Sequence, residues 1–193
     1  MLEKLYSLAD SPVMRTELQE LLRYQYNHID FIDSTTDLGF DCPLDVHCRY
    51  TRNQLFAALD YDSANLREGV KYLPEKKTDV FLITLNKSDK DYSPTTMYED
   101  YAISPSRFHW QSQSTTAADS PTGQRYIHHR ERGSKVLLFV REFKNDALGT
   151  SPYTFLGQAS YVSHTGSRPM NIVWQLEKPI PAKYLRRVQQ VMG

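Results

Sequence analysis

The sequence lacks the features that define secreted and membrane proteins. Only two cysteines, Cys42 and Cys48, occur among its 193 residues, too few for the disulfide framework of a small secreted domain. No apolar run approaches the roughly 18 residues that a membrane-spanning helix needs. The start, Met1-Leu2-Glu3-Lys4, has no apolar segment typical of a secretory signal. We therefore expect a cytoplasmic protein with no membrane partner.

Net charge is also absent, because 23 Lys and Arg balance 23 Asp and Glu. Together with 12% aromatic residues, this balance excludes intrinsic disorder. The charges are unevenly distributed: residues 1–103 hold 11 basic and 18 acidic residues, whereas residues 104–193 hold 12 and 5. Neutrality excludes a polycation that binds nucleic acid along its whole length, but a basic patch in the second half is compatible with it. Charge scattered over a solvated surface is the alternative.

Signatures of catalysis are missing as well. No glycine precedes a Lys-Ser or Lys-Thr pair, so the phosphate-binding loop of an NTPase is absent. No histidine begins the His-x-Lys signature of a phospholipase-D-type nuclease. Cys42, His47 and Cys48 fall short of the four ligands of a structural zinc site. We expect a binding module, not an enzyme, with no metal and no cofactor. The alternative is a metal-dependent hydrolase that uses His47, His128, His129 or Asp100.

Hydrophobic patterning divides the chain into two parts. Residues 1–42 are a predicted helical N-terminal extension, in which Ser11-Pro12 caps a helix and the acidic stretch 30–41 is a linker. Residues 43–193 mix strands with short helices. Strands are predicted near residues 79–85, 107–112, 135–143, 154–163 and 171–176, and helices after Thr51, after Ser120 and over 181–192. This pattern predicts an α+β domain.

Residues 84–114 combine the residue types that bind a planar base. Aromatic faces stack on a base, fixed polar groups recognise its hydrogen-bonding edge, and basic groups bind phosphates. The candidate base-pocket residues are Tyr92, Tyr98, Asp100, Tyr101, Trp110 and Gln113. The candidate DNA-backbone contacts of this segment are Lys87, Lys90, Arg107, His109, Ser112 and Ser114. The alternative is that the aromatics form core and that Asp100 pairs with Arg125.

An ordered series of motifs between residues 43 and 181 resembles one family. The series comprises Thr84-Leu85-Asn86-Lys87, residues 93–103 (SPTTMYEDYAI), residues 108–114 (FHWQSQS), residues 123–126, residues 138–142, residues 155–157 and residues 166–170 (GSRPM). It is similar to the uncharacterised C-terminal domain that follows a phospholipase-D-like nuclease and a superfamily-two helicase in bacterial SauUSI-type, modification-dependent restriction enzymes.

This resemblance implies a PUA/SRA-like mixed β-barrel with flanking helices over residues 43–193. The implied function is recognition of a 5-methylcytosine-type base in double-stranded DNA by base flipping. The resemblance also implies DNA-backbone contacts for Arg125 and Arg168. Among the candidate pocket residues, it implies a pocket role for Tyr98, Asp100, Tyr101, Trp110 and Gln113. A nuclease and a helicase, in cis or in trans, are the expected partners. The alternative is a protein-interaction or regulatory module of a helicase–nuclease that reads no base.

Overall fold

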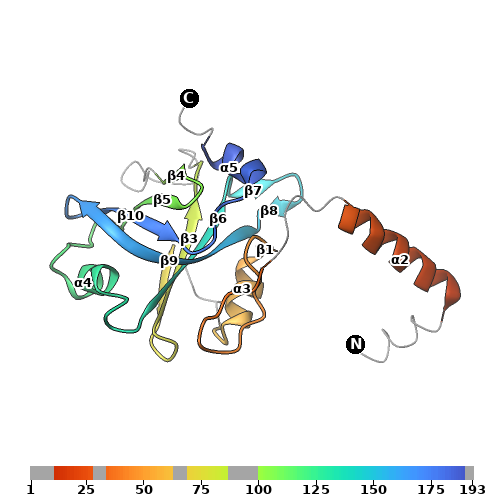
Figure 1. The fold of residues 1–193 in the computed structure, drawn as a ribbon, viewed down its shortest axis with the longest axis horizontal. Helices are drawn as coiled ribbons and strands as arrows, with labels where there is room; N and C mark the ends of the chain where they lie inside the picture. The colour runs from red at the N-terminus through yellow and green to blue at the C-terminus, as the bar shows by residue number, and fades with distance from the viewer. Residues whose placement is uncertain (1–10, 28–33, 63–68, 87–99, 190–193) are drawn as a thin grey trace. The chain divides into compact units, whose positions relative to one another are not determined.

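The computed structural model describes residues 11–27, 34–62, 69–86 and 100–189 (Figure 1). The chain divides into two compact units, Met1–Ile32 and Asp33–Gly193. The first unit contains α2 (Pro12–Asn27). The hydroxyl of Ser11 accepts a hydrogen bond from the backbone N–H of Met14 at 3.4 Å. The predicted helix start, a Ser cap followed by proline, is therefore confirmed.

The second unit combines strands with three short helices in its described residues. Its strands are β1 (Arg49–Tyr50), β2 (Val70–Leu73), β3 (Thr78–Thr84), β4 (Tyr101–Ser104), β5 (Arg107–Gln111), β6 (Lys135–Arg141), β7 (Asn145–Asp146), β8 (Gly149–Thr150), β9 (Tyr153–Thr165) and β10 (Asn171–Leu176). Its helices are α3 (Arg52–Ala58), α4 (Pro121–Ile127) and α5 (Ala182–Gln189). Thr51 caps α3 and Ser120 caps α4, as predicted. The α+β class is confirmed.

Among the described residues, eight strands form one sheet in the order β2–β3–β6–β9–β10–β5–β4, with β1 paired to β9. β3 and β6 run parallel, and the other neighbours run antiparallel. The long, curved β9 pairs with β6 through its first half and with β10 through its second (Figure 1). Register shifts occur in both pairings, and such bulges bend a strand. β9 therefore joins two sheet halves that face each other across an apolar core.

The expected closed barrel is wrong for the described part of the chain. Closure requires the two terminal strands of the sheet to pair with each other. Here β2 and β4 are short end strands, each paired with one neighbour. The space between the facing halves is filled by large buried rings, among them Phe81, Trp110 and Trp174. Aromatic packing, in place of a further strand ladder, holds the two halves together.

Two apolar cores lie on opposite faces of the β3–β6 pair. Alternation along β6 places Leu138 and Val140 in the inner core, between the sheet halves, and Leu137 and Phe139 in the outer core. The outer core also contains Leu38, which is fully buried although it falls in the predicted linker. This burial accounts for the second unit beginning at residue 33, before the expected boundary at residue 43.

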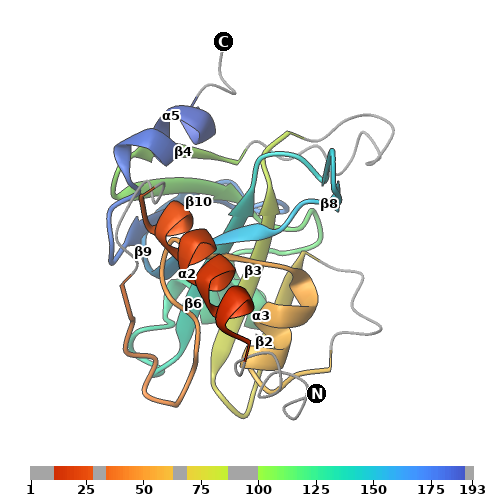
Figure 2. The same cartoon turned by 90° about the vertical axis from the view of Figure 1, so that its right-hand side faces the viewer.

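The last helix lies at the open end of the sheet. In both views α5 lies beside β4 (Figures 1 and 2). The backbone N–H of Ile180, just before α5, donates to the carbonyl of Pro105 at 2.7 Å, which connects this region to the β4–β5 turn. None of the helices in the described ranges has the length and apolar character that crossing a membrane requires.

Candidate nucleic-acid interface

The outward face of β4 and β5 brings several predicted site residues together. Strand alternation directs Trp110 into the inner core and leaves Arg107, His109 and Gln111 on the opposite face. Tyr101 of β4 is the register partner of His109, and their rings stack with centroids 4.7 Å apart. Both rings are half-buried, so an aromatic surface remains accessible. We call Tyr101, Arg107, His109 and Gln111 the outer strip.

An amide pair extends the outer strip onto β10. Gln111 and Asn171 are register partners, and Gln111 Nε2 donates to Asn171 Oδ1 at 3.0 Å. Both side chains are half-buried. Asn171 was missed by the sequence analysis, although the predicted strand 171–176 carried a usable signal. Its alternation places Asn171 on the face opposite the apolar Ile172 and Trp174.

Directly after β5, Ser112 is hydrogen-bonded to Met170 in the β9–β10 turn. Its backbone N–H donates to the carbonyl of Met170, and its hydroxyl accepts from the N–H of Met170, both at 2.9 Å. The hydroxyl also donates to the carbonyl of Gln113 at 3.2 Å. Ser112 is fully buried, so the structure gives it an internal role instead of the predicted contact with DNA.

Beyond Ser112, three predicted residues meet at one corner of the domain. The backbone N–H of Arg168 donates to the carbonyl of Thr116 at 3.2 Å, and the N–H of Thr116 donates to the carbonyl of Gln113 at 2.9 Å. Arg168 and Ser114 are exposed, and Gln113 is half-buried. We call Gln113, Ser114 and Arg168 the corner, which adds a cation and two polar groups to the end of the outer strip.

Trp110 does not belong to this surface. It is 5% exposed and stacks on Phe81 with ring centroids 4.1 Å apart. Its ring also makes a T-shaped contact with Tyr126, with ring centroids 5.6 Å apart. The structure therefore places Trp110 in the core and not in an accessible pocket, because the inward face of β5 packs against β3.

Asp100 has a supporting position behind the outer strip. Its carboxylate is buried, and Oδ1 accepts a hydrogen bond from the backbone N–H of Gln111 at 2.9 Å. The alternative ion pair with Arg125 is not formed. Four other predicted site residues lie outside the described residues: Lys87, Lys90, Tyr92 and Tyr98.

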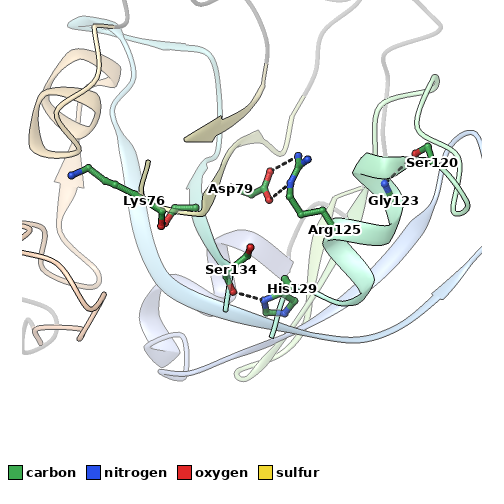
Figure 3. A network of polar contacts seen from close by, with 8 residues as sticks. Lys76, Asp79, Ser120, Gly123, Arg125, His129 and Ser134 are labelled. Carbon is green, nitrogen blue, oxygen red and sulfur yellow. Dashed lines mark hydrogen bonds and ion pairs between the residues drawn. The ribbon is translucent and has the colours of Figure 1, made fainter. Parts of the chain in front are cut away.

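Arg125, predicted to contact DNA, forms an internal ion pair (Figure 3). Its Nε and Nη2 donate to the two carboxylate oxygens of Asp79 at 2.8 and 2.9 Å. The guanidinium also lies over the ring of Tyr72, 4.0 Å from its centroid. The side chain of Asp79 is 0% exposed and that of Arg125 is 19% exposed. One edge of the guanidinium therefore binds Asp79 and one of its faces packs on Tyr72, and these contacts attach α4 to β3.

The pKa values of this pair reflect its burial. Desolvation raises the pKa of Asp79, while the hydrogen bonds and charge of Arg125 oppose that rise. Desolvation lowers the pKa of Arg125, but the hydrogen bonds and charge of Asp79 outweigh it, and the net pKa is raised. The guanidinium consequently stays charged, and its counter-charge comes from a residue that the sequence analysis did not select. The acidic start of the apolar run DVFLITL was the available signal.

All of the site residues described above lie within a stretch that matches one known protein family. Residues 44–188 match the family described as Domain of unknown function (DUF3427). The chain belongs to this family. Comparison with curated proteins finds no match. The matched range includes the outer strip, the corner and the Arg125–Asp79 pair, so all three are parts of the DUF3427 domain.

His129 of the DUF3427 domain is buried, and its ring is hydrogen-bonded to Ser134 (Figure 3). The backbone N–H of Tyr161 donates to Nε2 at 3.0 Å, so Nε2 is the acceptor nitrogen and carries no hydrogen. Nδ1 then carries the hydrogen and donates to the carbonyl of Ser134 at 3.1 Å. Desolvation lowers the pKa of His129, so the ring binds a proton less readily than in the unfolded chain.

We expect stability to fall as the pH drops from about 7 to about 5, because the unfolded chain takes up a proton that folded His129 does not. A lowered folded pKa gives stability that is present above the unfolded pKa and is lost below it. His129→Gln should flatten this dependence, whose slope is at most about 1.4 kcal/mol per pH unit. Urea denaturation at several pH values measures it. His128→Gln, at the partly exposed neighbour, is the control, and an unchanged slope in His129→Gln would contradict the assignment.

The metal-hydrolase alternative finds no arrangement to support it in the described ranges. No group of three or more His, Cys, Asp or Glu side chains there is placed to hold a metal ion. The thiol of Cys42 donates to the carbonyl of Ala58 at 3.7 Å, and burial raises its pKa. His129 uses both ring nitrogens within the domain.

Proposed function

We propose that this DUF3427 domain is a DNA-binding target-recognition domain that reads a 5-methylcytosine-type base. The observation that carries the proposal is the outer strip. It presents the stacked Tyr101 and His109 rings beside Arg107 and the Gln111–Asn171 amide pair. Rings of this kind stack on bases, amides recognise base edges, and arginine binds phosphate.

The motif resemblance supports the same surface. The FHWQSQS motif covers residues 108–111 of β5 and the first two residues of the corner, and the GSRPM motif forms the β9–β10 turn. These are the two segments that the hydrogen bonds of Ser112 join. By this resemblance we extend the proposal to a PUA/SRA-like mode of binding by base flipping. The partners would be a phospholipase-D-type nuclease and a superfamily-two helicase of a cytoplasmic restriction system.

The energetics of base flipping set the requirement for this surface. Extruding a base from a duplex costs a few kcal/mol, and stacking on an aromatic ring returns about 1–3 kcal/mol per base. Tyr101 is already held against His109, so little side-chain order has to be gained when a base stacks on it. Arg168 and Arg107, at separate places on the surface, are exposed and available to phosphates.

Fluorescence anisotropy of the chain with methylated, hydroxymethylated and unmodified duplexes at two salt concentrations tests the proposal. Tyr101→Ala should weaken binding to the methylated duplex by roughly 5- to 150-fold and abolish the preference for it. Tyr101→Phe, which keeps the ring, is the matched control. Arg168→Gln should weaken all duplexes alike and reduce the salt slope by about one.

Arg130→Gln serves as the charge control for Arg168→Gln, since Arg130 is an exposed arginine in the turn that follows α4. Equal losses of methylated and unmodified binding in Tyr101→Ala would show that the ring reads no base. An unchanged salt slope in Arg168→Gln would remove the corner from the interface.

A protein-interaction module is the second candidate, favoured by α2. Over its described side chains, residues 12–24, this helix exposes five large hydrophobic residues: Val13, Leu18, Leu21, Leu22 and Tyr24. A module that docks through α2 would show negligible affinity for any duplex at moderate salt. The anisotropy titration therefore separates the two candidates, because only the DNA-binding domain gives a signal in that range.

A further inference from the structure

Arg141, the last residue of β6, is a buried cation outside the proposed interface. It is 9% exposed. Its register partner is Thr84, the last residue of the parallel strand β3. Arg141 Nε donates to Thr84 Oγ1 at 2.9 Å, and Nη1 donates to the carbonyl of Ser151 at 3.2 Å. The guanidinium also lies over the ring of Tyr153, 4.4 Å from its centroid.

All of these partners are neutral, which distinguishes Arg141 from Arg125. Arg125 is more exposed than Arg141 and yet has a carboxylate of its own, Asp79. Among the described residues no ion pair includes Arg141. Burial of a charge without a counter-charge is costly, so proteins pair buried cations with anions. The geometry therefore calls for an anion beside Arg141 that the described residues do not supply.

The hydrogen-bond donors of Arg141 and Thr84 that have no acceptor among the described residues define the chemistry of that anion. A guanidinium has five N–H groups, and two of those of Arg141 have acceptors among the described residues. Thr84 accepts from Nε, so its own hydroxyl hydrogen remains available for donation. The ring of Tyr153 and the two hydrogen bonds fix the plane of the fork. A fixed fork of this kind binds the paired oxygens of phosphate.

We propose that Arg141, Thr84 and Tyr153 form a binding site for a phosphate group. The group is either a phosphodiester of DNA or a free phosphate anion, and the site does not depend on whether the outer strip reads a base. Two oxygens of the phosphate accept from the unpaired N–H groups of Arg141, and one accepts from the hydroxyl of Thr84. Arg141 is 9% exposed and so offers little accessible area, which suits one phosphate group better than an extended polyanion.

Calorimetric titration and thermal unfolding of the 193-residue chain with sodium phosphate, against sodium chloride at equal ionic strength, test the site. We expect phosphate to bind the wild type and to raise its Tm. Arg141→Met should weaken phosphate binding by about tenfold or more, and Thr84→Val should weaken it by a smaller factor. Arg130→Gln, which removes the same charge from an exposed position, should bind phosphate like the wild type.

Arg141→Met should also unfold close to the wild-type Tm in phosphate-free buffer, because it leaves no partner carboxylate unpaired. If that variant does not fold, Arg141→Lys replaces it, since it keeps the charge and loses the fork. No phosphate binding by the wild type, or equal binding by the wild type and the Arg141 variant, overturns the proposal. Loss of affinity for an unmodified duplex in Arg141→Met identifies the ligand as a phosphodiester, and unchanged affinity identifies it as free phosphate.

The failure of this site and the failure of base recognition have different signatures. If base recognition fails, wild-type phosphate binding persists while the preference for methylated duplex is absent. If the phosphate site fails, the preference for methylated duplex persists and still depends on Tyr101. The two measurements use the same purified chain.

Discussion

Trp110→Ala is expected to lower the free energy of unfolding by about 3–5 kcal/mol, as is usual when a large buried ring is truncated. Trp110 is 5% exposed. Its ring stacks on Phe81 with centroids 4.1 Å apart and makes a T-shaped contact with Tyr126 with centroids 5.6 Å apart. The ring lies between the two halves of the sheet, so its removal leaves a cavity where the halves meet. Urea denaturation followed by circular dichroism measures the loss.

Trp110→Phe is the matched control, because it keeps an aromatic ring against Phe81 and should lose less stability. Tyr101→Ala, on the opposite face of the sheet, should change the free energy of unfolding much less than Trp110→Ala does. A Trp110→Ala protein of wild-type stability that had lost its preference for methylated DNA would contradict the core assignment. It would restore the pocket role that the sequence suggested.

The two outcomes for β5 show what a single sequence can and cannot determine. Strict alternation correctly predicted that Phe108 and Trp110 share one face of a strand. Alternation cannot say which face is buried, because that depends on what packs against it. Here the answer comes from Phe81, on a strand that precedes β5 in the chain. The other face thereby became the outer strip.

Long-range pairing limited the prediction of charged residues in the same way. The sequence offered Asp100 as the structural partner of Arg125, whereas the structure pairs Arg125 with Asp79, 46 residues away. Both candidates are aspartates, so residue type could not separate them. For Asn171, alternation along its own strand indicated the exposed face, but its partner Gln111 lies 60 residues away in the sequence. Local capping at Ser11, Thr51 and Ser120 depends on near neighbours and was predicted correctly.

The open sheet has a comparable explanation. Strand positions follow from local alternation, but closure depends on whether the end strands meet. Four-residue β2 and β4 lie at the ends of the described sheet, and the bulky inner core separates the two halves. The described sheet is therefore open, and the PUA/SRA-like mode of binding is a proposal that rests on the motif resemblance.

Arg125→Met is expected to cost about 3–5 kcal/mol of unfolding free energy at pH 7, because it leaves the carboxylate of Asp79 buried and unpaired. The side chain of Asp79 is 0% exposed, and Arg125 donates one charge-assisted hydrogen bond to each of its carboxylate oxygens. The loss should shrink toward pH 4. Without Arg125 the folded pKa of Asp79 rises further above its unfolded value, so protonation at low pH removes the penalty.

Asp79→Leu combined with Arg125→Met should recover most of that stability, since a buried ion pair replaced by apolar side chains is often neutral or stabilising. Denaturation of the two single variants and the double variant forms a double-mutant cycle that isolates the pair. The double variant also tests the DNA contact first expected of Arg125. If it binds unmodified duplex as the wild type does, the guanidinium acts within the fold. If it is stable but binds duplex weakly, Arg125 contacts phosphate despite its bond to Asp79.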